Sequence, residues 1–85
     1  MAGYSILFRK SVGRDLARIP KRDVKRIMDR ICALAEDPRP HGCEKLSSQE
    51  RYRVRQGMYR IVYSIQDREL TTWGVKVGHR SDVYR

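Results

Sequence analysis

The sequence predicts an α+β domain with the element order β-α-α-β-β-β, in which a two-helix hairpin packs on one face of a mainly antiparallel four-stranded sheet. Three features carry this prediction: an apolar and aromatic segment near the start, two stretches with apolar residues three and four apart, and strict alternation through the last third. The chain has 85 residues, so we expect one domain spanning residues 1–85 with a modest core.

The first half is predicted to form a strand followed by two helices. Residues 4–8 are apolar, aromatic and β-branched, as in a strand. A first helix is indicated by apolar residues that share one face, namely Val12, Leu16 and Ile19. Ser11 is placed to cap that helix through its hydroxyl. Pro20 ends it, because the residue before a proline avoids the α region, and Pro20 also stands at the entry to the second helix.

The second helix has the clearest pattern in the chain. Its apolar residues recur at intervals of three and four, at Val24, Ile27, Met28, Ile31, Leu34 and Ala35. Charged residues fill the remaining faces, as expected of a helix with one buried stripe. Residues 37–42 then break the pattern with two prolines and a glycine, which predicts a loop.

The last third is predicted to form a three-stranded meander. The strands are expected at 52–55, 58–65 and 70–77, with turns at 56–57 and 67–69. Tyr59, Ile61 and Tyr63 alternate with other side chains and are expected to face the helices. In the last strand we expect Trp73, Val75 and Val77 on one face and Lys76 on the other.

The charge balance points to an anionic partner. The formal net charge is +9 and the isoelectric point is about 10.2, which favours nucleic acid, an acidic protein or an anionic membrane. A membrane partner is disfavoured, because no apolar run approaches the ~20 residues that span a bilayer. With no secretory signal visible, we expect a cytoplasmic protein in which Cys32 and Cys43 are reduced thiols.

Three arginines are predicted to share the sheet face that the helices leave open. Arg53 and Arg55 alternate with apolar residues on one strand, and Arg60 follows on the next. Guanidinium groups bind phosphate in a two-pronged geometry and stabilise charge that develops during a reaction. The alternative is that these arginines are ordinary solvated charges on a sheet surface.

Arginine stays protonated, so a proton-transfer role falls to other residues near the C-terminus. Tyr84 has an ordinary pKa near ~10 that nearby arginines would lower, and His79 titrates closer to neutral pH. Both also have plain structural interpretations, as a stacking tyrosine and a turn histidine. Together with Arg80, this set suits attack of a ribose 2′-OH on the adjacent phosphate, a reaction for which we expect no metal or cofactor.

A second basic region lies on the predicted helices. Its candidate RNA-binding residues are Arg22, Lys25 and Arg26. They fit salt-sensitive contacts with ribosomal RNA phosphates. A solvated helix face is the alternative interpretation.

Four features together resemble a known family. The element order, the loop LAEDPRPHGCEKL, the hairpin YRVRQGMYRIVY and the ending VKVGHRSDVYR are similar to the RelE branch of the RelE/ParE toxin superfamily, over essentially the whole chain. The resemblance implies the toxin of a type II toxin–antitoxin pair that cleaves messenger RNA in the ribosomal A site. It also implies an acidic RelB-like antitoxin as partner, with operator DNA contacted only indirectly through that antitoxin.

The resemblance also implies roles for individual residues. Arg53, Arg55 and Arg60 would bind the phosphate and the transition state. Tyr84 would be the base, and Arg80 or His79 would act on the leaving-group side. RelE has lysine where this chain has Arg53, Arg55 and His79, so the positive charge at the pair is kept without the proton chemistry of a neutral lysine.

Two other functions remain open on the sequence. One is a ParE-like toxin that inhibits DNA gyrase by binding, without catalysis. The other is a non-catalytic RNA-binding protein, whose binding would be sequence-blind and steeply salt-dependent.

Overall fold

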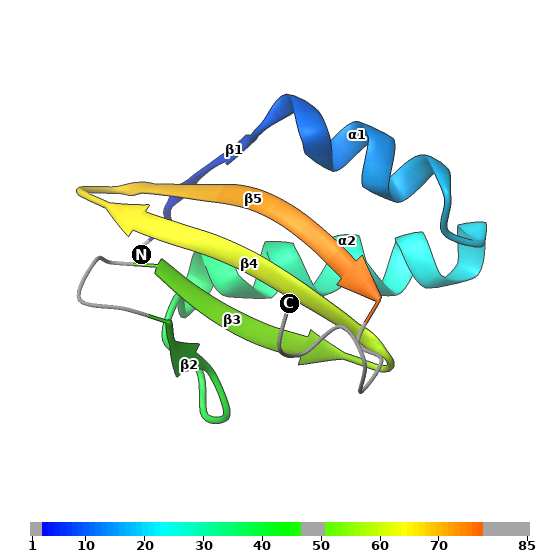
Figure 1. Ribbon diagram of the computed structural model, residues 1–85. Helices are drawn as coiled ribbons and strands as arrows, with labels where there is room; N and C mark the ends of the chain where they lie inside the picture. The colour runs from blue at the N-terminus through cyan, green and yellow to red at the C-terminus, as the bar shows by residue number, and fades with distance from the viewer. Residues whose placement is uncertain (1–2, 47–50, 78–85) are drawn as a thin grey trace.

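The computed structural model describes residues 3–46 and 51–77, which form two helices and five strands (Figure 1). The elements in chain order are β1 (Ser5–Phe8), α1 (Lys10–Ala17), α2 (Lys21–Glu36), β2 (Glu44–Lys45), β3 (Arg51–Gln56), β4 (Tyr59–Gln66) and β5 (Glu69–Val77). The sheet order is β1-β5-β4-β3-β2. Helix α2 crosses one face of the sheet, and α1 runs alongside β5 (Figure 1). No helix in the described ranges is long and apolar enough to cross a membrane.

The predicted α+β fold is confirmed, with one strand more than expected. Strands β3, β4 and β5 form the antiparallel meander, and β1 joins it in parallel beside β5. The additional strand is β2, whose two residues pair antiparallel with Arg53 and Tyr52. A two-residue strand shows no alternation, so the sequence pattern could not reveal it. The turn between β3 and β4 has Gly57 at a φ of 61°, a conformation that favours glycine.

The core lies between α2 and the sheet face that α2 covers. Its fully buried members include Ile27, Ile31 and Leu34 from α2 and Ile61, Tyr63 and Leu70 from the sheet. The alternating pattern of the meander therefore predicted the buried face of β3 and β4 correctly. Val24 and Met28, also predicted on the apolar stripe, are only half-buried.

The tyrosines of the buried face place their hydroxyls on polar partners. Tyr63 donates to the carbonyl of Pro38 at 2.7 Å, and Tyr59 donates to Asp23 at 3.1 Å. Burial raises the pKa of Tyr63 well above its ordinary value. Burial and then the bond to Asp23 raise the pKa of Tyr59. Both phenols therefore stay protonated at neutral pH and join the sheet to α2 and to the loop that follows it.

A β-bulge in β5 turns Trp73 to the open face of the sheet. Val62 pairs with Gly74 and the next residue, Tyr63, pairs with Thr72, so Trp73 is an extra residue with no opposite partner. Its indole nitrogen donates to the hydroxyl of Ser64 at 2.7 Å. The prediction that Trp73 shares a face with Val75 and Val77 is therefore wrong, because strict alternation breaks at the bulge.

Two side chains of α1 bond to the backbone of β5 beyond the end of β1. Ser11 donates its hydroxyl to the carbonyl of Trp73 at 3.0 Å, and Asp15 accepts from the N–H of Val75 at 3.0 Å. The predicted capping role of Ser11 is wrong: the N-cap is Arg9, and no side chain caps the helix. The hydroxyl instead donates to a backbone carbonyl of β5, at a part of the strand edge that β1 does not reach.

Replacing Asp15 with Ala should destabilise the fold by about 1–3 kcal/mol, because the partly buried N–H of Val75 loses its acceptor. The free energy of unfolding in urea would measure the loss. Asp29→Ala is the matched control, since Asp29 is an exposed aspartate on α2. Equal stability of the two variants would show that the bond to β5 contributes nothing.

Candidate nucleic-acid site on the open face of the sheet

Three basic side chains form a row across the open face of the sheet. Arg55 of β3 pairs with Arg60 of β4, which in turn pairs with Lys76 of β5. Directly opposed residues in a sheet lie ~4.5–5.5 Å apart at Cβ. We call Arg55, Arg60 and Lys76 the cation row. Like charges placed directly opposite one another destabilise a sheet. The cation row therefore destabilises the fold, and an anionic ligand would relieve the repulsion.

The positions of the three predicted arginines on this face follow the alternation of β3 and β4. Arg53 and Arg55 lie opposite to the buried side chains of Tyr52 and Val54. Arg60 differs from expectation in one respect: it is only 7% exposed, whereas Arg55 and Lys76 are exposed. A ligand on this face therefore meets Arg55 and Lys76 first.

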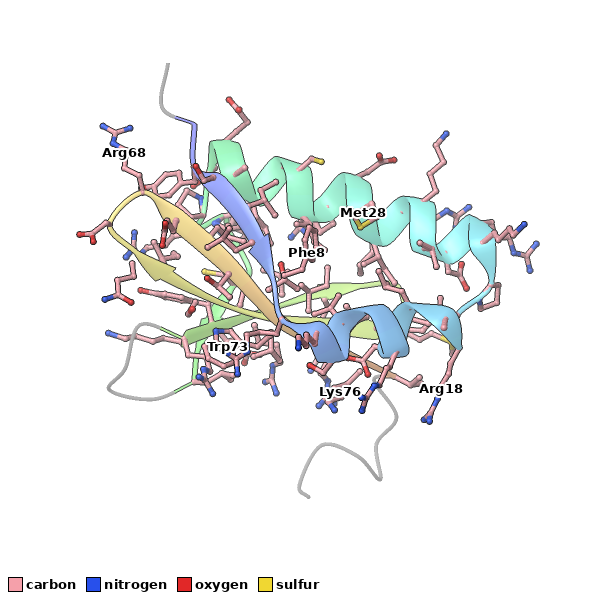
Figure 2. The ribbon with its side chains drawn as sticks, turned by 90° about the horizontal axis from the view of Figure 1, so that it is seen from above. Phe8, Arg18, Met28, Arg68, Trp73 and Lys76 are labelled. Atoms are coloured by element: carbon pink, nitrogen blue, oxygen red, sulfur yellow. The ribbon has the colours of Figure 1, made fainter. Side chains whose placement is uncertain are left out.

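Lys76 belongs to this site, although it was not among the predicted site residues. The sequence placed it opposite to the valines of its strand, which is correct for Val75 and Val77. Figure 2 shows Lys76 and Trp73 on the side of the sheet away from α2. The sequence does not show the register of β4 and β5, and it is this register that sets Lys76 directly beside Arg60.

Glu44 of β2 holds Arg53 at the margin of the cation row. The Nε of Arg53 donates to the Glu44 carboxylate at 3.1 Å, and an Nη of Arg53 donates to the same oxygen at 2.5 Å. This hydrogen bond and the charge of Arg53 hold the pKa of the Glu44 carboxyl below its ordinary value, with smaller contributions from Arg55 and Arg60. The sequence reasoning missed Glu44, since β2 itself was not predicted. The carboxylate orients Arg53 and would compete with any phosphate that approached its guanidinium group.

The helix cations occupy a different surface. Arg22, Lys25 and Arg26 are exposed on α2, which covers the face opposite to the cation row. Arg26 alone approaches the meander, where it lines a hollow of about 210 Å³ with residues of the β3–β4 turn such as Gly57 and Met58. The structure therefore does not bring the two predicted basic groups together into one site.

Comparison with known proteins identifies the family. Residues 6–84 match the family described as ParE toxin of type II toxin-antitoxin system, parDE. The chain belongs to the RelE/ParE family of type II toxins. Toxin RelG of Mycobacterium tuberculosis is 29% identical over 87 residues, which cover 96% of this chain and 97% of that protein.

Solved structures agree with this assignment. The archaeal RelE–RelB complex from Pyrococcus horikoshii OT3 contains a chain that is 25% identical, with a TM-score of 0.79, and the match covers 94% of this chain and 99% of that one. The isolated E. coli RelE toxin has a TM-score of 0.80 at 19% identity, covering 95% of this chain and 90% of that one. That second likeness concerns the fold alone. The predicted membership of the RelE/ParE superfamily is confirmed.

In this RelE/ParE toxin, the remaining predicted site residues lie outside the described ranges. His79, Arg80 and Tyr84 all follow Val77, the last residue of β5. Their roles as base and leaving-group acid therefore stay predictions. Within residues 3–46 and 51–77, no group of three or more His, Cys, Asp or Glu side chains is arranged to hold a metal ion.

Replacing Glu44 with Gln should strengthen RNA binding at neutral pH, because Arg53 is released and one negative charge is removed.

The same replacement should change the stability of the fold in a pH-dependent way. The lowered pKa of Glu44 means that its ion pair stabilises the fold above the unfolded carboxyl pKa of ~4.3. That contribution is lost as the pH falls through the lower folded value. The difference in Tm between wild type and variant should therefore vanish on acidification.

Fluorescence anisotropy of a labelled single-stranded RNA would measure the binding part of this prediction. Glu69→Gln serves as the control, because it removes the same charge from an exposed position at the start of β5. RNA binding that tightens equally in both variants would mean that net charge alone, and not the release of Arg53, is responsible.

Proposed function

We propose that this toxin is a ribosome-dependent endoribonuclease that cleaves messenger RNA by attack of a 2′-OH on the adjacent phosphate, and thereby inhibits translation. The observation that carries the proposal is the cation row beside Arg53, on the sheet face that α2 leaves uncovered. Solvated surface charges seldom stand in direct register on adjacent strands, since they repel one another there.

The cations of the open face account for two parts of such a reaction. Guanidinium groups of Arg53 and Arg55 would bind the phosphate that flanks the attacking hydroxyl and stabilise the charge that it gains in the transition state. Arg60, nearly buried in the central strand of the row, would stabilise the charge that grows on the phosphorane oxygens. Stabilisation of this kind is commonly the largest single contribution to catalysis.

Proton transfer is assigned to the residues that follow β5. Tyr84 would take the proton of the 2′-OH, a role that nearby arginines would favour by stabilising its phenolate. His79 or Arg80 would assist departure of the 5′-oxygen. Tyr59 and Tyr63 do not compete for the role of base, since both have a raised pKa and bond to protein acceptors.

The exposed cations of α2 would dock the toxin on ribosomal RNA. Arg22, Lys25 and Arg26 lie on the opposite side from the cation row. A toxin held in this way could present its sheet to the messenger RNA while its helix contacts the ribosome. The whole reaction belongs in the cytoplasm, where ribosomes and messenger RNA are found.

The natural partner would be an acidic, RelB-like antitoxin. The P. horikoshii relative was solved as a RelE–RelB complex, and the charge of +9 on this chain favours binding of an acidic chain. Contact with operator DNA would come only through the antitoxin. Co-purification with the product of an adjacent small acidic reading frame would support this pairing, and failure to bind any such product would count against it.

Expression in growing cells, with mapping of RNA ends, tests the proposed activity. We expect growth arrest, with cuts confined to translated regions of messenger RNA. Blocking translation initiation beforehand should abolish the cuts, because the toxin would lack its ribosomal substrate. Growth arrest with intact messenger RNA would overturn the proposal.

The description of the matched family, ParE toxin, favours inhibition of DNA gyrase as the second candidate. Binding to gyrase would need no phosphate-binding row and no proton-transfer group. Double-strand DNA breaks that depend on gyrase, in cells whose messenger RNA stays intact, would establish this alternative.

A further inference from the structure

We propose that Trp73, whose ring is covered by the guanidinium groups of Arg9 and Arg51, forms with them a surface that binds a nucleotide of the RNA that flanks the cleaved bond. We call these three residues the Trp73 platform. The proposal rests on the proposed function for the identity of the strand, but it concerns a separate place on the open face. None of the three residues belongs to the cation row.

The platform is assembled from three distant parts of the chain. The guanidinium carbon of Arg9 lies 4.3 Å from the centre of the Trp73 ring, and that of Arg51 lies 4.2 Å from it. The bulge in β5 turns the ring to this face, and the bond from its nitrogen to Ser64 fixes its orientation. The ring is thus fixed under the two guanidinium groups, whose planes are themselves surfaces on which a base can stack.

Among the described residues, no acidic side chain neutralises the charge of the platform. Across residues 3–46 and 51–77, no carboxylate pairs with Arg9 or Arg51. The buried Nε of Arg51 has no hydrogen-bond acceptor among the described residues. An open hollow of about 450 Å³, lined by Phe8, Arg9, Lys10 and Ser11, lies beside the platform. Two cations on one aromatic ring with adjoining space suit an anionic ligand that also has a flat face.

A nucleotide meets that description better than an acidic peptide. Unpaired bases stack on aromatic rings and on guanidinium planes, while the adjoining phosphate accepts hydrogen bonds from the same arginines. A carboxylate of an acidic peptide would interact with the positive charge of the arginines but would not stack. Stacking on aromatic rings contributes ~1–3 kcal/mol per base in single-strand binding proteins.

The position of the platform also fits a strand that continues from the cation row. Arg51 and Arg55 are four residues apart on β3, which places them about 13 Å apart along the strand. Both point to the open face, because they are separated by an even number of residues. One RNA strand could therefore cross the face, with the cleaved phosphate at the cation row and a flanking nucleotide at the platform.

Trp73 is the only tryptophan in the chain, so its fluorescence reports directly on the platform. The test titrates the purified full-length toxin with a single-stranded RNA of about eight nucleotides, whose 2′-OH groups are methylated to prevent cleavage. We expect a saturable change in Trp73 emission with the same midpoint as the anisotropy of the labelled RNA. Full binding by anisotropy without a change in emission would overturn the proposal.

Arg9→Gln and Arg51→Gln should each weaken RNA binding about fivefold at 0.1 M salt. Each loses one phosphate contact, and one contact contributes about 0.7 to the slope of log K against log salt concentration for a single strand. Arg68→Gln is the charge-matched control: Arg68 is exposed in the turn before β5, well away from Trp73 in Figure 2. Equal weakening in all three variants would show that only net charge matters, and would overturn the platform.

Two further outcomes separate this proposal from the proposed function. If wild-type toxin binds the RNA at Trp73 but never cuts messenger RNA on ribosomes, the platform stands and the nuclease assignment falls. If wild type cuts, and Arg9→Gln and Arg51→Gln match Arg68→Gln in both binding and KM, the nuclease stands and the platform falls. Loss of affinity for an acidic antitoxin peptide with unchanged RNA affinity would instead assign the platform to protein docking.

Discussion

Arg55→Gln is expected to lower the rate of messenger RNA cleavage on the ribosome by about 10²–10³-fold, as for the loss of one preorganised group that stabilises transition-state charge. The same change should leave the stability of the fold intact or increase it. Arg55 faces Arg60, which also faces Lys76, so removing one charge relieves repulsion within the cation row.

Single-turnover cleavage on programmed ribosomes and thermal unfolding would measure the two effects on the same preparations. Arg68→Gln again supplies the control, because it removes an equal charge from an exposed turn. A variant at Arg55 that cleaves at the wild-type rate would show that the cation row is not part of the active site. A large drop in Tm would show that Arg55 is needed for the fold instead.

Ile31→Ala should destabilise the toxin by about 2–5 kcal/mol, the range for truncating a large aliphatic side chain inside a core. Ile31 is fully buried on the face of α2 that packs against the sheet. A small domain has little stability in reserve, since folded proteins are stable by only ~5–15 kcal/mol. A substantial fraction of the variant should therefore be unfolded at physiological temperature.

Urea unfolding followed by circular dichroism would measure this loss. Cys32→Ala is the matched control, because Cys32 is the next residue on α2 and its side chain is exposed. We expect the control to unfold within ~0.5 kcal/mol of wild type. Similar losses at both positions would contradict the assignment of the buried face of α2.

Periodic patterns predicted the parts of the fold that are regular. The spacing of Ile27, Ile31 and Leu34 identified the buried stripe of α2, and alternation placed Arg53 and Arg55 on the open face. These elements depend on local geometry, which repeats along the chain. The family resemblance rested on motifs spread along the whole length, and the match of residues 6–84 to the family confirms it.

Features that depend on pairing between strands were not predictable from the sequence. The bulge at Trp73 exists only relative to β4, and the two residues of β2 become a strand only beside β3. The same reason explains why Glu44 was missed as the partner of Arg53. Nothing in a single sequence shows that Arg9 and Arg51 meet on one ring, because they come from segments far apart in the chain.

The most direct test of the nuclease proposal compares two messenger RNAs on programmed ribosomes. One is all-ribose, and the other carries a single 2′-deoxy nucleotide on the 5′ side of the bond that is cut in the first. Attack by the 2′-OH predicts a cut in the all-ribose RNA, no cut at that bond in the deoxy RNA, and no cut in either when ribosomes are omitted. Equal cleavage of both RNAs, or equal cleavage without ribosomes, would contradict the mechanism.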